Sequence, residues 1–291
     1  RQAFVVELVD RREDLGNAIA LNSSIFSGAR LVGPAIAGLL IAAVGSAVCF
    51  TIDGFSYIAV ILGLLAMRIR PRSLETSESQ GVLKRLKEGL NYAFGFAPIR
   101  AILLLVGVVS LVGMPYTVLV PIFASQILGG GAETLGFLMA AAGLGALIAA
   151  VYLGSRKSIL GLGRLIAIAP AIFGVALIVF SQSRMLWLSL LAMFVAGGSF
   201  ILQSTSGNTI LQTIVEEDKR GRVMSLYAIA FISMATFGNL FAGSLANQIG
   251  APSTLTISGS ICIVASLVFS RQLPELRKIV LPIYSRMVLV K

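Results

Sequence analysis

The sequence predicts an all-α, polytopic membrane protein, and three observations lead to this fold class. Hydrophobic residues make up 57% of the 291 residues and charged residues only 12%, whereas a soluble domain carries roughly 25% charged residues. Eight stretches approach or exceed the ~20 apolar residues that a helix needs to cross a bilayer. Almost all Lys and Arg residues fall on one side of these stretches, as expected of a membrane protein.

The eight predicted spans cover residues 17–44, 46–67, 99–127, 135–154, 165–180, 185–215, 223–249 and 253–270.

The charge distribution predicts the orientation of these spans. Arg30 lies within the first span and Arg184 in a connection on the far side, so the other 21 of the 23 Lys and Arg residues share one side with both chain ends. Basic connections face the cytoplasm, and we therefore expect both termini there. The net charge of +10 is spread over five separate segments, which argues against a nucleic-acid interface.

Composition also excludes several kinds of chemistry. The chain contains no His, which excludes His-ligated zinc and Ser-His catalysis. The two Cys residues, Cys49 and Cys262, lie in apolar runs and form neither a disulfide framework nor a metal cluster. Since no clustered nucleophile, acid pair or ligand set occurs, we expect no enzymatic activity, no metal and no cofactor.

The one long connection, residues 68–98, begins with a polar stretch and continues in a helical pattern. Val82, Leu83, Leu86 and Leu90 share one face of the predicted helix. Such a helix lies on the cytoplasmic membrane surface or forms a solvated linker, and the sequence leaves both interpretations open. In either case, the segment separates the first two spans from the remaining six.

The span at 99–127 contains residues that interrupt a regular helix. Pro115 and Pro121 predict a broken helix, because Pro lacks a backbone donor and clashes with the preceding turn. Transporters use broken helices near their substrates. Tyr116, next to the first break, is therefore a candidate cavity residue.

The span at 185–215 contains a segment that is polar on every side, which lipid does not tolerate at depth. We expect Gln203 to lie deep enough to line a cavity. Asn208 and Gln212 lie nearer the cytoplasmic end, where we expect them to order a gate.

An internal repeat relates the first span to the seventh. Gly33 and Gly38 have the spacing of Gly238 and Gly243, which lie 205 residues further on, and both spans follow a charged turn. The seventh span is the sixth after the first, and a parallel repeat of six helices is a known transporter architecture. We therefore expect a twelve-helix protein whose first four helices precede this chain.

The predicted organisation is two helices of an N-terminal bundle in residues 1–67, a linker with an amphipathic helix in 68–98, a six-helix C-terminal bundle in 99–272 and a cytoplasmic tail in 273–291.

The first span resembles a motif of drug:proton antiporters in the major facilitator superfamily. Ala29, Gly33, Pro34, Ala37 and Gly38 follow the order of its G-x-x-x-G-P-x-x-G-G signature, with Ala in place of two glycines. The segments Asn17-Ala-Ile-Ala-Leu-Asn-Ser23 and Arg220-Gly-Arg-Val-Met-Ser-Leu-Tyr227 look like the branch of enterobactin exporters and macrolide efflux proteins. The likeness covers essentially the whole chain.

This resemblance implies a monomeric transporter of the bacterial inner membrane. It implies proton-coupled efflux of a small amphiphilic solute, of the drug or siderophore class, by alternating access of two helix bundles. The partners would be the solute, protons and the lipid bilayer. An uptake symporter and a non-transporting membrane fragment or scaffold remain the alternatives.

Two ionisable residues within the predicted spans are candidates for coupling. A charge at the depth of Arg30 is costly unless it faces the protein interior, and Ser23 and Ser27 share its helix face. Arg30 either holds an anion or a titrating carboxylate in a central cavity, or hydrogen-bonds backbone carbonyls of neighbouring helices. Asp53, the only acid within a span, either carries a proton or pairs structurally with a neighbouring Ser or Arg.

Overall fold

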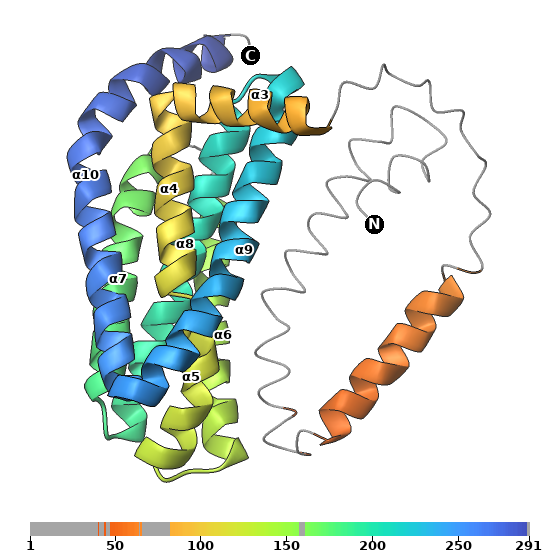
Figure 1. Ribbon diagram of the computed structural model, residues 1–291, viewed down its shortest axis with the longest axis vertical. Coiled ribbons are helices and arrows are strands. Elements are labelled where there is room, and N and C mark those ends of the chain that lie inside the picture. The colour runs from red at the N-terminus through yellow and green to blue at the C-terminus, as the bar shows by residue number, and fades with distance from the viewer. Residues whose placement is uncertain are drawn as a thin grey trace.

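The computed structural model of the chain describes residues 47–63, 82–156 and 161–289, together with Leu40, Val44 and Leu65. These residues form helices joined by short turns, and no strand occurs among them, which confirms the predicted all-α class. Six helical stretches in this part of the chain are long and apolar enough to cross a membrane (Figure 1). Their bounds are Ala97–Ile127, Ala132–Ser155, Leu162–Gln182, Leu186–Ile214, Lys219–Ile249 and Ala251–Val280.

These six stretches match the six spans predicted after residue 98. The apolar helix Ala47–Gly63 covers most of the span predicted at 46–67. The span predicted at 17–44 lies outside the described residues, apart from two of its positions. At the other end, α10 (Ala251–Leu289) continues through most of the segment predicted as a tail, so that segment is helical.

The helix predicted within the linker is present as α3 (Val82–Gly95). It packs against α9 (Glu217–Ile249) and α4 (Ala97–Val112) and runs across the end of the bundle rather than along it (Figure 1). The chain turns between α3 and α4 at Phe96, whose backbone is extended, and Pro98 occupies the first turn of α4. Pro is well tolerated there, because the first N–H groups of a helix have no partner within it.

The first span after the linker is broken, as its two Pro residues predict. It consists of α4, then α5 (Tyr116–Ile122), then the π-helical turn η2 (Phe123–Ile127). Pro115 stands at the start of α5 and Pro121 lies inside it. The irregular backbone follows from the hydrogen bonds that these two residues cannot make.

Glycines allow α6 (Ala132–Ser155) and α8 (Leu186–Ile214) to approach each other closely, and these two helices share one of the largest interfaces in the bundle. A Cβ atom on Gly145 would overlap the carbonyl oxygen of Phe194, and one on Gly197 would overlap that of Ala142. Close approach through small residues is how helices associate in a bilayer, where burial of apolar surface no longer drives packing.

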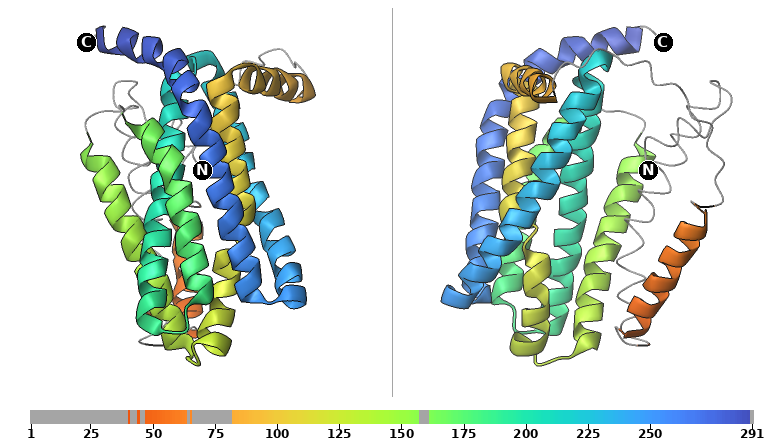
Figure 2. Two further views of the ribbon diagram at one scale, coloured as in Figure 1. Left: turned by 90° about the vertical axis from the view of Figure 1, so that its left-hand side faces the viewer. Right: turned by 45° about the vertical axis from the view of Figure 1, so that its right-hand side comes forward.

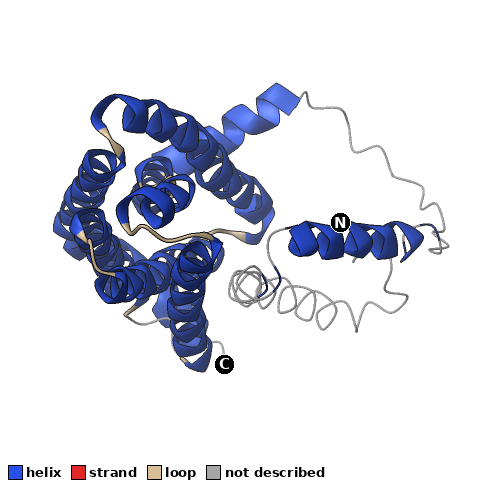
Figure 3. Ribbon diagram, turned by 90° about the horizontal axis from the view of Figure 1, so that it is seen from below, coloured by secondary structure: helices blue, strands red, loops and turns tan. Residues whose placement is uncertain are grey.

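A second tight pair consists of α7 (Leu162–Gln182) and α10. Gly174 and Gly259 face each other there, and a Cβ on either would meet the carbonyl oxygen of the other. The hydroxyl of Ser266 donates to the carbonyl of Ala167, which links the same two helices by a hydrogen bond. Seen end-on, the helices of the bundle pack around one another (Figure 3).

The least buried of the six stretches lies in α9. This helix packs mainly on α4, where Gly238 meets the carbonyl of Leu111. Its other side exposes Phe237, Leu240 and Phe241, which are 54%, 69% and 70% exposed. As Figure 2 shows, α9 stands at the edge of the bundle, and this apolar side suits contact with lipid or with another helix.

Candidate functional site

The polar segment of α8 divides into two faces. Gln203 and Ser206 are buried and lie on the same side as Gly207, whose neighbours are Ile102 of α4 and Ile166 of α7. The hydroxyl oxygen of Ser206 has no hydrogen-bond partner in the described part of the chain. This face of α8 therefore points into the interior of the six-helix bundle.

The opposite face of α8 is open and also polar. Thr205 and Gln212 are exposed and Asn208 is half-buried, and steps of three and four residues place them on one stripe. The amide of Gln212 donates to the side-chain oxygen of Asn208 at 2.5 Å. We call Thr205, Asn208 and Gln212 the open polar face of α8.

A chain of aromatic rings leads through the bundle. Tyr116 of α5 meets Phe173 of α7 edge-on, with ring centroids 5.9 Å apart. Phe173 lies 5.7 Å from Phe200 of α8, and Phe200 lies 5.8 Å from Phe231 of α9. Phe231 stacks on Tyr227 with centroids 6.3 Å apart. The sequence-predicted Tyr116 is thus the buried first member of a series that ends in α9.

The last ring of this series connects α9 to the polar segment of α8. The hydroxyl of Tyr227 donates to the carbonyl oxygen of Ser204 at 2.8 Å, next to Thr205 of the open polar face. Phe231, one turn further along α9, is only half-buried, so a partly accessible ring lies on the helix that this hydrogen bond links to α8. Such a combination offers both apolar contact and hydrogen bonds to a small molecule.

The six described spans after the linker carry no charge at depth. No Asp, Glu, Lys or Arg occurs within residues 101–132, 165–183, 185–215 or 223–249. Among the described residues no group of His, Cys, Asp and Glu is close enough to hold a metal ion. The chemistry that this bundle offers to a solute is therefore hydrogen bonding, aromatic contact and apolar packing.

The comparison with known proteins agrees with the helical fold and the apolar spans. Residues 1–282 match the family described as transmembrane secretion effector. The chain belongs to this family of major facilitator transporters. The family match confirms the predicted superfamily and the multi-pass membrane character.

Three relatives of this chain are named as transporters or efflux pumps. The staphyloferrin A transporter of Staphylococcus aureus is 24% identical over 92% of this chain and 66% of its own length. An uncharacterised MFS-type transporter of Bacillus subtilis is 27% identical over 86% of this chain and 62% of its own length. The multidrug efflux pump Tap of Mycobacterium tuberculosis is 26% identical over 88% of this chain and 61% of its own length. The chain thus spans about two thirds or less of the length of these relatives, and their character as transporters and pumps supports the prediction that it is not an enzyme.

Of the remaining residues that the sequence predicted for the site, one lies in the described part of the chain and the others lie outside it. Asp53 lies in the helix Ala47–Gly63, is exposed, and its backbone carbonyl accepts a hydrogen bond from the hydroxyl of Ser56 at 2.7 Å. The other predicted residues lie outside the described part of the chain: Ser23, Ser27, Ala29, Arg30, Gly33, Pro34, Ala37 and Gly38. The proposed roles of Arg30 and Asp53 in coupling therefore remain predictions.

Several residues of the site were not predicted from the sequence, and three of them show why. Thr205 belongs to the open polar face, and Phe200 and Phe231 belong to the aromatic series. A helical projection of 185–215 would have grouped Thr205 with Asn208 and Gln212. The two Phe residues could not be found in this way, because an aromatic residue in an apolar span gives no indication of its neighbours.

Proposed function

We propose that this protein exports a small amphiphilic solute from the bacterial cytoplasm across the inner membrane. The observation that carries the proposal is the open polar face of α8, a helix that also holds Phe200, the ring next to the half-buried Phe231. An amphiphile needs both apolar contact and a few placed hydrogen bonds. The multidrug efflux pump among the relatives supports the direction of transport.

We further propose that two helix bundles alternate in access and that proton antiport drives the cycle. Within this chain, the spans from residue 101 on are uncharged, so Arg30 and Asp53 are its candidates for coupling. Asp53 is the proposed proton carrier, because it is the only acid within the predicted spans of this chain. Arg30 is the proposed partner of the solute or of that carboxyl.

The test of export uses everted membrane vesicles that contain the protein. On energisation, we expect uptake of a fluorescent amphiphile such as ethidium, or of staphyloferrin A, and a change of lumenal pH on addition of the transported compound. Asp53→Asn should abolish the pH change. If a transported compound causes no pH change with the unaltered protein, proton antiport is wrong.

The test of the site compares substitutions on two helices. Asn208→Leu and Thr205→Leu remove polar groups from the open polar face and should lower the transport rate about 5- to 150-fold, because an unpaired polar group of the solute costs about 1–3 kcal/mol. Ser260→Leu is the matched control, since Ser260 is exposed on α10, away from this face. Equal transport by all three variants would contradict a role for the open polar face.

A further inference from the structure

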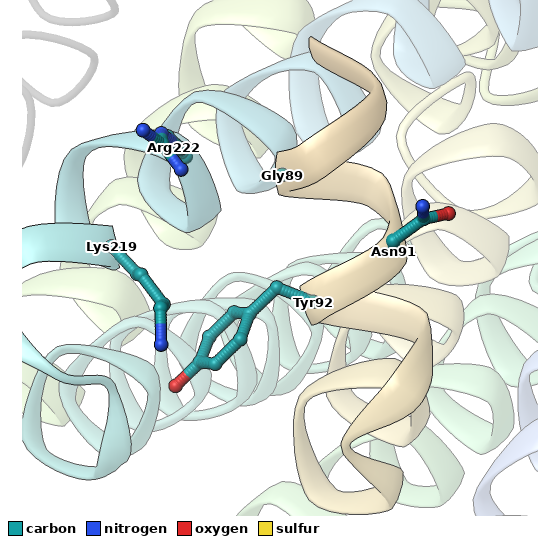
Figure 4. Close-up of a pocket in the computed structure, with 5 residues that line it drawn as sticks. All are labelled: Gly89, Asn91, Tyr92, Lys219 and Arg222. Atoms are coloured by element: carbon teal, nitrogen blue, oxygen red, sulfur yellow. The ribbon is translucent and has the colours of Figure 1, made fainter. Parts of the chain in front are cut away.

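A cavity lies where α3 crosses α9 at the end of the bundle (Figure 4). Its volume is about 300 Å³, and it is lined by Gly89, Asn91 and Tyr92 of α3 and by Lys219 and Arg222 of α9. The lining thus offers two cations and a phenol, and no acid, whereas the side chain of Asn91 points away from these groups in Figure 4. This combination suits a small anion with several hydrogen-bond acceptors.

Lys219 is positioned by contacts on two sides of the cavity. Its ammonium nitrogen lies 4.7 Å from the centre of the Tyr92 ring and 2.6 Å from a carboxylate oxygen of Glu216. The Glu216 side chain is 62% exposed, and ion pairs in contact with water contribute little to stability. An anion in the cavity can therefore take the place of this carboxylate at modest cost.

Because Gly89 has no side chain, it leaves room for the side chain of Arg222. A Cβ atom on Gly89 would lie only 3.3 Å from the Cβ of Arg222, so any larger residue would press on this side chain. In Figure 4 Arg222 stands beside Gly89, while Lys219 extends toward Tyr92. The two cations therefore reach the cavity from neighbouring turns of α9.

The charge around the cavity favours a singly charged ligand. Arg220, between the two lining cations, has a buried Nε without a hydrogen-bond partner in the described part of the chain. Three acids, residues 216–218, directly precede these three cations. Glu216, which pairs with Lys219, would repel a dianion more strongly than a phosphodiester, which carries one negative charge and four oxygens.

The position of the cavity favours a lipid as the source of that phosphodiester. The cavity opens at the end of the transmembrane helices, beside a helix that crosses the bundle end (Figure 1). Phospholipid headgroups occupy this level of a bilayer, and basic pockets between helices there bind anionic headgroups. We propose that Lys219 and Arg222, with Tyr92, bind the phosphodiester of an anionic phospholipid.

The experiment measures thermal unfolding of the detergent-purified protein with added lipid. We expect phosphatidylglycerol to raise the unfolding midpoint more than phosphatidylcholine does, because choline places a positive charge beside the cations. In the double variant Lys219→Gln/Arg222→Gln, the apparent affinity for phosphatidylglycerol should fall about tenfold or more, as the loss of charge-assisted hydrogen bonds predicts. The midpoint in phosphatidylcholine should stay unchanged, which shows that the variant is folded.

Arg164→Gln provides the matched control. Arg164 is an exposed cation in the first turn of α7, at the same end of the bundle, and its loss changes the net charge without touching the cavity. Retained preference for phosphatidylglycerol in this control supports the proposal, and an equal loss in control and double variant overturns it. An increase in the midpoint with inorganic phosphate, and none with phosphatidylglycerol, would also overturn the lipid assignment in favour of a soluble anion.

Discussion

At the scale of single residues, glycines decide how closely the helices of the bundle approach. Gly145 and Gly154 lie in the same helix, α6, yet their surroundings differ. A Cβ on Gly145 would overlap the backbone of Phe194, whereas a Cβ on Gly154 would meet nothing within 4 Å. Only the first of these glycines is required by packing.

This difference predicts opposite effects of the same substitution. Gly145→Ala should lower the free energy of unfolding by about 1–3 kcal/mol, because α6 and α8 must separate to admit the methyl group. Gly154→Ala should leave it unchanged or raise it by up to ~1 kcal/mol through better helix propensity. Thermal unfolding in detergent measures both. Equal midpoints for the two variants would contradict the tight contact between α6 and α8.

Tyr227 allows the hydrogen bond between α8 and α9 to be tested without loss of the ring. Tyr227→Phe removes the hydroxyl that donates to the Ser204 carbonyl and keeps the stacking on Phe231. We expect a loss of about 0.5–1.5 kcal/mol of stability, the usual net contribution of one hydrogen bond. Thr236→Val, which removes an exposed hydroxyl bonded within α9 itself, is the control and should have a smaller effect on the unfolding midpoint.

At the scale of elements, the sequence predicted which helices form and where one is broken better than it predicted which face of a helix is buried. The apolar positions of 82–90 predicted α3, and Pro115 and Pro121 predicted the broken helix, because both effects are local. The face of α8 that stays open depends on where α6, α7 and α9 cross it, and neighbouring polar residues such as Gln203 and Thr205 look alike in the sequence. Their separation into an interior and an open face therefore needed the tertiary structure.

The docking of α3 depends on a small residue at its contact with the bundle. Ala93 is fully buried there, so Ala93→Asp would place an unpaired charge in the interface. Because such a charge costs about 3–5 kcal/mol, we expect α3 to detach and trypsin to cleave after Lys87 more than about tenfold faster. Asn91→Asp adds the same charge at an exposed position of α3 and should leave the cleavage rate near that of the unaltered protein.

At the scale of the whole molecule, the charges mark the two ends of the bundle. Arg184 lies in the turn between α7 and α8, and it is exposed. Arg164 and Arg222 lie near the starts of α7 and α9, at the opposite end. The positive-inside rule assigns the end with more cations to the cytoplasm, so the fold and the charge together predict an absolute orientation in the membrane.

Cysteine labelling in intact cells tests this orientation. With Cys49 replaced by Ser, the remaining native thiol, Cys262, is fully buried and should not react. A membrane-impermeant maleimide should then label Arg184→Cys in intact cells, whereas Arg164→Cys should be labelled only after permeabilisation, since the two positions lie at opposite ends of α7 and its following turn. Labelling of the Arg164→Cys variant in intact cells, with protection of the Arg184→Cys variant, would mean that the basic end faces outward. In that orientation, export from the cytoplasm would require the solute to enter at the end that carries Arg184 and to leave at the basic end.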